Sequence, residues 1–207
     1  MTDHHRDHHA DRPHEVRAFF APRAADWDTK FPDDGPAYAA GVAELGLQDG
    51  ERVLDAGCGT GRALPALRDA VGPRGTVLGA DLTPEMLRAA VRAGRDRRAA
   101  LVLADVTRLP LPDAALDAVF AAGLLSHLPD SAGGLTELAR TVRPGGRLAL
   151  FHPIGRAALA ARKGRPITPD DLRAEPNLRP LLAKCGWELA RYEDCDARYM
   201  ALAVRRG

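Results

Sequence analysis

A glycine-rich turn constrains the fold of this chain more than any other segment. Residues 52–62 read RVLDAGCGTGR, so a short apolar run ends in Asp55 and three glycines follow at alternate positions, Gly57, Gly59 and Gly61. The next residues, 61–71, have the composition of a helix. The pattern predicts a strand, a tight turn and a helix, because glycine adopts backbone angles that a β-carbon forbids and lets a ligand approach the main chain. The helix would point its free N–H groups at that ligand.

Two further apolar runs also end in a carboxylate. Residues 76–80 run into Asp81, and residues 101–104 run into Asp105. Ligands of parallel sheets bind at the carboxyl ends of the strands, where an acid such as Asp81 can accept both hydroxyls of a ribose. A fourth pattern, RPGGR at 143–147, precedes another apolar run.

The spacing of the glycines points to one family. D-x-G-x-G-x-G differs from the G-x-G-x-x-G of dinucleotide-binding folds. Together with Asp81, Asp105 and the RPGGR turn, it resembles class I S-adenosylmethionine (SAM) dependent methyltransferases, of the type 11/25-like small-molecule group, over about residues 40–152. The resemblance implies that the glycine loop lies against the methionine part of SAM and that Asp105 accepts from the adenine amino group. The predicted cofactor-binding residues are Asp55, Ala56, Gly57, Cys58, Gly59, Thr60, Gly61, Asp81, Leu82, Met86, Asp105, Val106, Ala121 and Ala122.

The rest of the chain predicts an α/β protein, a Rossmann-like three-layer α/β/α sandwich. Strands are expected at 52–55, 76–81, 101–104, 116–121 and 146–152, with helices between them, so the sheet should be mostly parallel. The resemblance implies seven strands, of which 187–192 and 198–204 form an antiparallel C-terminal hairpin. Further helices are expected at 14–21, 36–47 and 177–184, and Thr168–Asp171 is expected to cap one more.

Length and composition predict one main domain. The chain has 207 residues, of which 45% are hydrophobic. We expect a disordered His-rich tail at 1–13 and a methyltransferase domain at 14–207. Within that domain, 14–50 would be a helical lid, 51–152 the SAM-binding core, and 153–207 the substrate-side helices and hairpin. Trp27, Phe31 and Tyr38 either contact the ligand from the lid or pack the N-terminal helices against the core.

Two histidines follow strands at the carboxyl edge of the predicted sheet and are candidate catalytic residues. His127 and His152 could act as a general base, because imidazole has a pKa near neutrality. A structural hydrogen-bonding role remains open for each. The basic segment 154–168 either forms a wall of the acceptor pocket that seats an anionic substrate or, as we prefer, is a solvated surface.

The predicted function is methyl transfer from SAM to a small molecule, at an O, N or C atom that the sequence leaves open. A SAM-binding sensor or non-catalytic partner subunit is the alternative. An NAD-dependent oxidoreductase is remote, because no Tyr-x-x-x-Lys pattern is present. The net charge of +1 disfavours a nucleic-acid substrate.

Composition also bounds the setting in which the protein works. No apolar run is long enough to span a bilayer and the N-terminus is no secretion signal, so we expect a cytoplasmic protein, monomeric or homodimeric. The cysteines, Cys58, Cys185 and Cys195, lack C-x-x-C spacing, so no metal site is expected. Cys58 is expected to be a small side chain that faces the strands.

Overall fold

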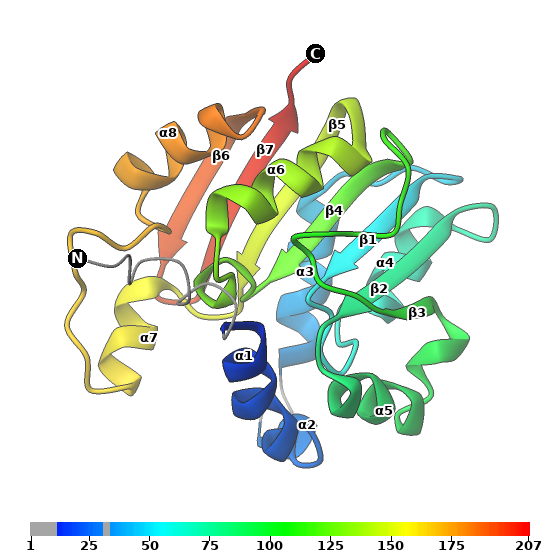
Figure 1. The fold of residues 1–207 in the computed structure, drawn as a ribbon, viewed down its shortest axis with the longest axis horizontal. Helices are drawn as coiled ribbons and strands as arrows, with labels where there is room; N and C mark the ends of the chain where they lie inside the picture. Colours follow the sequence, from blue (N-terminus) through cyan, green and yellow to red (C-terminus); the bar gives the residue numbers. More distant parts are fainter. Residues whose placement is uncertain (1–11, 31–33) are drawn as a thin grey trace, which may run out of the picture.

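A seven-stranded mixed sheet forms the centre of the protein (Figure 1). The structure is a computed structural model that describes residues 12–30 and 34–207. The strand order is β3-β2-β1-β4-β5-β7-β6. The strands are β1 (Arg52–Ala56), β2 (Thr76–Asp81), β3 (Ala100–Leu103), β4 (Leu116–Ala122), β5 (Val142–His152), β6 (Trp187–Cys195) and β7 (Arg198–Arg205). The first five are parallel and β7 is antiparallel to both of its neighbours, which confirms the predicted fold class and hairpin.

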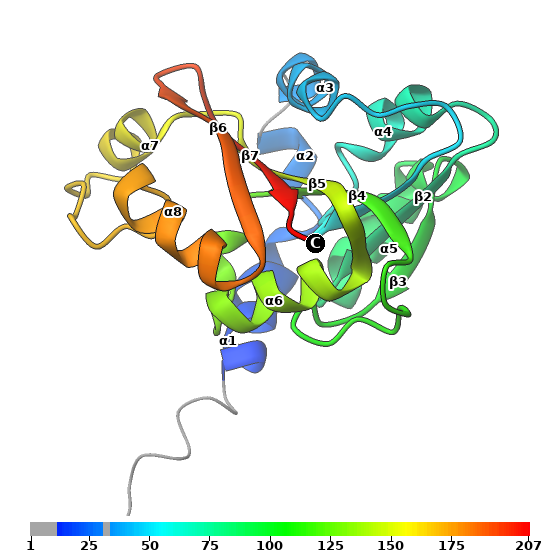
Figure 2. The ribbon, with the colours of Figure 1, turned by 90° about the horizontal axis from the view of Figure 1, so that it is seen from above.

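Helices cover both faces of the sheet (Figure 2). One face carries α3 (Gly35–Glu44) and α4 (Leu64–Val71), and the other carries α6 (Ser131–Thr141) and α8 (Glu175–Lys184). Neighbouring strand residues point to opposite faces, so Val53 packs with α3 and α4 whereas Leu54 packs in the core beneath α6 and α8. Trp187 joins this second core and donates its indole N–H to the Leu135 carbonyl oxygen at 2.9 Å.

The shorter helices lie mainly at one edge of the sheet. The remaining helices are α1 (Arg12–Phe20), the 3-10 turn η1 (Ala21–Arg23), α2 (Trp27–Lys30), α5 (Pro84–Arg92) and α7 (Arg156–Arg162), with further 3-10 turns η3 (Arg95–Arg97) and η4 (Leu125–His127). In Figure 1, α1, α2 and α7 lie beyond the carboxyl ends of the parallel strands. The same ends carry the acids that follow the apolar runs, so a site at this edge has walls from distant parts of the chain.

Two expectations about helices were wrong. The helix after the glycine loop begins at Leu64, not at residue 61, because Gly61 (φ +80°) continues the turn. Thr168–Asp171 caps no helix, and α8 begins only at Glu175. The Asp171 carboxylate instead accepts from the backbone N–H of Arg173 and pairs with the side chain of Arg156, which holds this segment as a turn.

One helix was unexpected, and part of the predicted tail cannot be compared. α7 lies inside the segment that sequence reasoning treated only as basic. Residues 1–11 of the predicted His-rich tail, and Phe31 of the predicted lid, lie outside the described residues.

Candidate functional site

A cavity of about 950 Å³ opens at the carboxyl edge of the parallel strands. Its walls come from the glycine loop, the ends of β2, β3, β4 and β5, the N-terminal helices, and the segment 153–173. Cavities that bind drug-sized ligands span roughly 300–1,000 Å³, so this one is large enough for a nucleoside and a second molecule.

The glycine loop folds tightly against β2. Gly57, Gly59 and Gly61 have φ values of +69°, +54° and +80°. The backbone N–H groups of Gly57 and Cys58 both donate to the Ala80 carbonyl oxygen, at 2.8 and 2.9 Å. A β-carbon on Gly57 would lie 2.9 Å from a Leu124 methyl carbon, so both conformation and space require glycine there.

Asp81 closes this loop from the end of β2. One carboxylate oxygen accepts from Gly59 N at 2.8 Å and the other from Thr83 N at 2.7 Å. Burial raises the pKa of Asp81, and these two backbone hydrogen bonds act in the opposite direction. Each carboxylate oxygen has more than one acceptor site, so both can still accept from a ligand hydroxyl.

Asp105 lies beyond the end of β3 and also lines the cavity. Its Oδ1 accepts from the backbone N–H and the hydroxyl of Thr107, at 2.9 and 2.8 Å. No described residue donates to its Oδ2. The turn therefore fixes the carboxylate while leaving one oxygen available to an amino group.

Asp55 is the most deeply buried acid of the site. Its side chain is 2% exposed, and no hydrogen bond from a described residue reaches it. Burial, together with the nearby Asp81 carboxylate, raises the pKa of Asp55 to about 8. The carboxyl group is therefore largely protonated at neutral pH in the ligand-free protein.

Most of the predicted cofactor-binding residues line this one cavity. They are Asp55, Gly57, Cys58, Gly59, Thr60, Asp81, Leu82, Met86, Asp105, Val106 and Ala122. The predicted contacts Ala56, Gly61 and Ala121 do not line it, because Ala56 and Ala121 are buried in the core and Gly61 packs against Leu64. Cys58 is buried, and a β-carbon on Gly79 of β2 would lie 3.1 Å from its sulfur, so its side chain faces the strands.

Both predicted histidines line the cavity, but they differ in their partners. The ring of His127 lies against Phe19 and Phe20, with centroids 6.3 and 4.9 Å away. Nδ1 of His152 lies 2.9 Å from the Ile154 carbonyl oxygen and 3.1 Å from Ile154 N. No described residue hydrogen-bonds to the His127 ring, so its nitrogens are the more available to a ligand.

Burial, with nearby positive charges, keeps both histidines neutral. Partial burial and the positive charges of Lys163 and Arg173 lower the pKa of His127. Burial also lowers the pKa of His152, against the opposing effect of the hydrogen bond between its ring and the Ile154 carbonyl oxygen. A neutral imidazole at neutral pH can accept a proton.

An ionic cluster that sequence reasoning missed holds the N-terminal segment on the glycine loop. The Asp28 carboxylate accepts from the Thr60 hydroxyl at 2.7 Å and pairs with Arg95 at 2.7 Å and Arg62 at 3.4 Å. Arg62 also pairs with Asp34 at 2.9 Å. These residues are far apart in the sequence and follow no helical or strand spacing, so no local pattern signals the cluster.

The basic segment contributes to the cavity wall more than sequence reasoning preferred. Arg156, Arg162, Lys163 and Arg165 all line the cavity, although the last three are also exposed. The solvated-surface interpretation is therefore incomplete.

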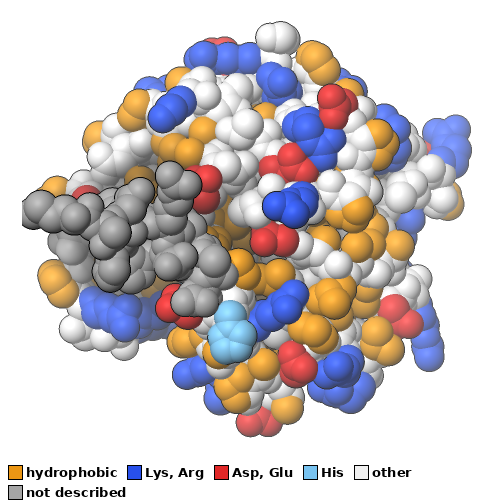
Figure 3. Space-filling model, viewed as in Figure 1, with side chains coloured by type: hydrophobic (Ala, Val, Ile, Leu, Met, Phe, Trp, Pro, Cys, Tyr) orange, Lys and Arg blue, Asp and Glu red, His pale blue; other side chains and the backbone are white. Residues whose placement is uncertain are grey.

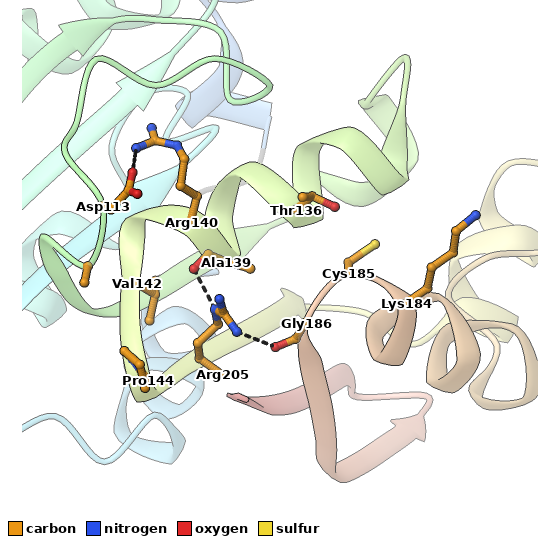
Figure 4. Close-up of a pocket in the computed structure, with 11 residues that line it drawn as sticks. Asp113, Thr136, Ala139, Arg140, Val142, Pro144, Lys184, Cys185, Gly186 and Arg205 are labelled. Atoms are coloured by element: carbon orange, nitrogen blue, oxygen red, sulfur yellow. Dashed lines mark hydrogen bonds and ion pairs between the residues drawn. The ribbon is translucent and has the colours of Figure 1, made fainter. Parts of the chain in front are cut away.

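A second depression, of about 470 Å³, lies where α6 meets β5, away from the glycine loop (Figure 4). Arg140 in its wall pairs with Asp113 at 2.6 Å, and Arg205 donates to the Ala139 and Gly186 carbonyl oxygens. These cations already have partners within the chain, so the cavity at the carboxyl edge is the better candidate site.

The surface adds two observations. Lys and Arg side chains are interspersed with Asp and Glu on the face shown in Figure 3. Within residues 12–30 and 34–207, no helix combines the length and apolar character that a membrane span requires.

Comparisons with known proteins agree with the geometry of this site. Residues 54–150 match a family model described as a methyltransferase domain. The 27-O-demethylrifamycin SV methyltransferase of Amycolatopsis mediterranei (strain S699) is 40% identical over 110 residues, which cover 51% of this chain and 40% of that protein. A demethylmenaquinone methyltransferase of Mycobacterium sp. (strain KMS) is 35% identical over 143 residues, 67% of this chain and 59% of that one.

A solved structure extends the likeness over nearly the whole chain. The magnesium protoporphyrin IX methyltransferase of Synechocystis PCC 6803, with bound S-adenosylhomocysteine (SAH), has a TM-score of 0.71 at 21% identity. The match covers 94% of this chain and all of that one, and it supports the fold. The chain spans less than two thirds of the length of the two curated relatives.

Proposed function

Because this chain carries a class I SAM-dependent methyltransferase domain with SAM as its cofactor, we propose that it transfers the methyl group of SAM to a small-molecule acceptor and releases SAH. One observation carries the proposal: the glycine loop and three strand-end acids open into a single cavity that continues beyond them to two neutral histidines. The two curated relatives are named for reactions on small molecules, which supports an acceptor of this class.

The main chain, carboxylates and apolar side chains of this cavity fit a nucleoside with a cationic amino-acid tail. The main chain of the glycine loop would lie beside the methionine part, with the acidic Asp55 nearby. Asp81 would accept from the ribose hydroxyls and the free Oδ2 of Asp105 from the adenine amino group. Leu82, Met86 and Val106 line the same region and would contact the adenine ring.

SAM supplies an activated methyl group on a sulfonium, which a nucleophile attacks in line. The chain must therefore mainly hold the acceptor at the correct distance and exclude water, and such positioning can supply about 7–11 kcal/mol at best. Phe19, Phe20 and Trp27 line the cavity from the N-terminal helices and would shield it from water. His127 would remove a proton from an acceptor that needs activation, a contribution of about 10²- to 10⁴-fold.

Binding and turnover measurements test the proposal. Isothermal titration should detect SAM and SAH but no NAD, and mass spectrometry should detect a methylated product when SAM and a panel of small acceptors are supplied. Binding of SAH without any methylated product would favour the sensor alternative. Binding of NAD in place of SAH would contradict the proposal and favour the oxidoreductase.

A further inference from the structure

We propose that the acceptor binds as an organic anion with an apolar, ring-containing body, and that Lys163 and Arg173 select it by its charge. This inference rests on the proposed methyl-transfer function and names the class of molecule that fills the acceptor end of the same cavity.

Charge is separated along the cavity. The end formed by β1, β2 and the loop after β3 carries Asp55, Asp81 and Asp105. The other end, formed by α7 and the segment that follows it, carries Arg156, Arg162, Lys163, Arg165 and Arg173, against only Asp170 and Asp171 among the acids of that wall. In Figure 1, α7 lies beyond the β5–β7 side of the sheet, whereas β2 and β3 lie at the opposite side. The α7 end of the cavity is therefore the richer in cations, although Arg23, Lys30 and Arg62 also line the cavity and Arg62 is paired with Asp28 and Asp34.

Two of these cations face the histidines. Lys163 and Arg173 line the same cavity as His127 and His152, and their positive charges help to lower the pKa of both imidazole rings. Arg173 is bound to Asp171, and Asp171 is shared with Arg156. Lys163 forms no ion pair with any residue in the described ranges. An ammonium group that forms no ion pair with the described residues, on the wall of the cavity, suits a ligand oxyanion.

The wall between these cations and the cofactor end is apolar and aromatic. Phe19, Phe20, Leu124, Leu128, Ile154 and Leu159 all line the cavity. Aromatic rings prefer edge-to-face or offset contacts with other rings, so this wall suits a flat, ring-containing body. A polar sugar or a nucleotide base edge would find few partners among these side chains.

The chemistry of methyl transfer is consistent with an anionic acceptor. If the reacting hydroxyl of the acceptor enters protonated, it gives its proton to the His127 imidazole. The acceptor oxygen then forms a bond to the methyl carbon while the carbon–sulfur bond breaks and its electron pair remains on sulfur. A carboxylate becomes an ester, or a phenolate or enolate an ether, at the cofactor end, whereas a separate anionic group at the other end of the ring-containing body stays at Lys163.

Paired titrations on SAH-loaded protein test the proposal. The probes are 2-naphthoate and its neutral isostere 2-naphthamide, and the proteins are wild type, Lys163→Met, Lys163→Arg and the control Lys184→Met. Lys184 is the last residue of α8 and Lys163 directly follows the last residue of α7, but Lys184 lies outside the cavity. We expect wild type to bind the anion about tenfold more tightly than the amide, as one charge-assisted contact implies. Lys163→Met should bind the two probes within about twofold of each other, whereas Lys163→Arg and Lys184→Met should keep the preference.

Equal binding of the two probes to wild type, or binding of neither, would overturn the proposal. So would a Lys163→Met variant that keeps the full preference for the anion. The SAH titration that precedes each experiment reports on the cofactor alone. Loss of SAH binding in wild type would refute the proposed function itself, whereas SAH binding without anion preference refutes only the acceptor class.

Discussion

Asp55 makes the stability of the ligand-free protein depend on pH in a way that one substitution should remove. Its carboxyl group is buried at the end of β1 and has no hydrogen-bond donor among the described residues. Asp55→Asn keeps the shape of the side chain but cannot ionise. The substitution therefore removes the cost of protonating the carboxyl group on folding, without opening a cavity.

The size of the effect follows from the two pKa values. The pKa of Asp55 is about 8 in the fold and near its ordinary value of 3.8 in the unfolded chain, because burial disfavours the charged form. Between these values the unfolded state has lost the proton that the folded state keeps. The free energy of unfolding therefore falls as pH rises, by about 1.4 kcal/mol per pH unit from this group. From about pH 5 to about pH 7 the loss is on the order of 3 kcal/mol.

Urea unfolding of wild type and Asp55→Asn, followed by tryptophan fluorescence at several pH values, measures the difference directly. Other titrating groups are common to both proteins, so the difference in unfolding free energy isolates Asp55. A matched control is Asp117→Asn. Asp117 is partly buried on β4, but hydrogen bonds from Arg143 and Arg52 outweigh that burial and lower its pKa, so it stays ionised across this range. Its substitution should cost stability equally at each pH.

The result that would refute this reasoning is simple to state. If Asp55→Asn and wild type differ by a constant amount between about pH 5 and about pH 7, then Asp55 is ionised in the fold and its pKa is not raised. The same titrations with saturating SAH should reduce the difference in slope if the α-ammonium group of the bound SAH compensates the carboxylate.

Three further predictions concern catalysis, the N-terminal segment and the glycine loop. His127→Ala should lower kcat by about 10²- to 10⁴-fold on an acceptor that must lose a proton, and it should leave SAH affinity unchanged. Because the pKa of His127 is lowered, the wild-type rate should persist to pH values below the usual range for histidine. An unchanged kcat in the variant would exclude His127 as the base. Asp28→Asn should weaken SAH binding roughly tenfold in a titration and speed proteolysis within 21–30, because Arg62 and Arg95 lose their carboxylate partner. The control Asp26→Asn, at an exposed position, should have neither effect. Gly61→Ala should lower the free energy of unfolding, measured in urea, by about 1–3 kcal/mol more than Gly46→Ala does. Both glycines have positive φ, but only a β-carbon at position 61 would meet a leucine side chain, at 2.7 Å. Equal losses in the two variants would contradict the steric argument.

The parts of this fold that the sequence predicts are those set by a few neighbouring residues. Alternating glycines after an apolar run need a turn with positive φ, and the structure has one there. Asp81 and Asp105 follow apolar runs, and parallel strands bring their carboxyl ends to one edge, so both acids line the same cavity. Where such patterns misled, a tertiary contact had taken the side chain, as when Arg156 and Arg173 hold the Asp171 carboxylate that was expected to cap a helix.

The sequence by itself determined the class of fold and the edge of the sheet at which three acids and two histidines gather, because each of these depends on residues adjacent in the chain or on the order of strands. Only the tertiary structure decided how the cavity is closed and charged. The contacts of Asp28 with Arg62 and Arg95, of Phe20 with His127, and the position of Lys163 join segments that are distant in sequence. Such contacts follow no period of helix or strand, so they become visible only when the packing of the whole sheet brings the segments together.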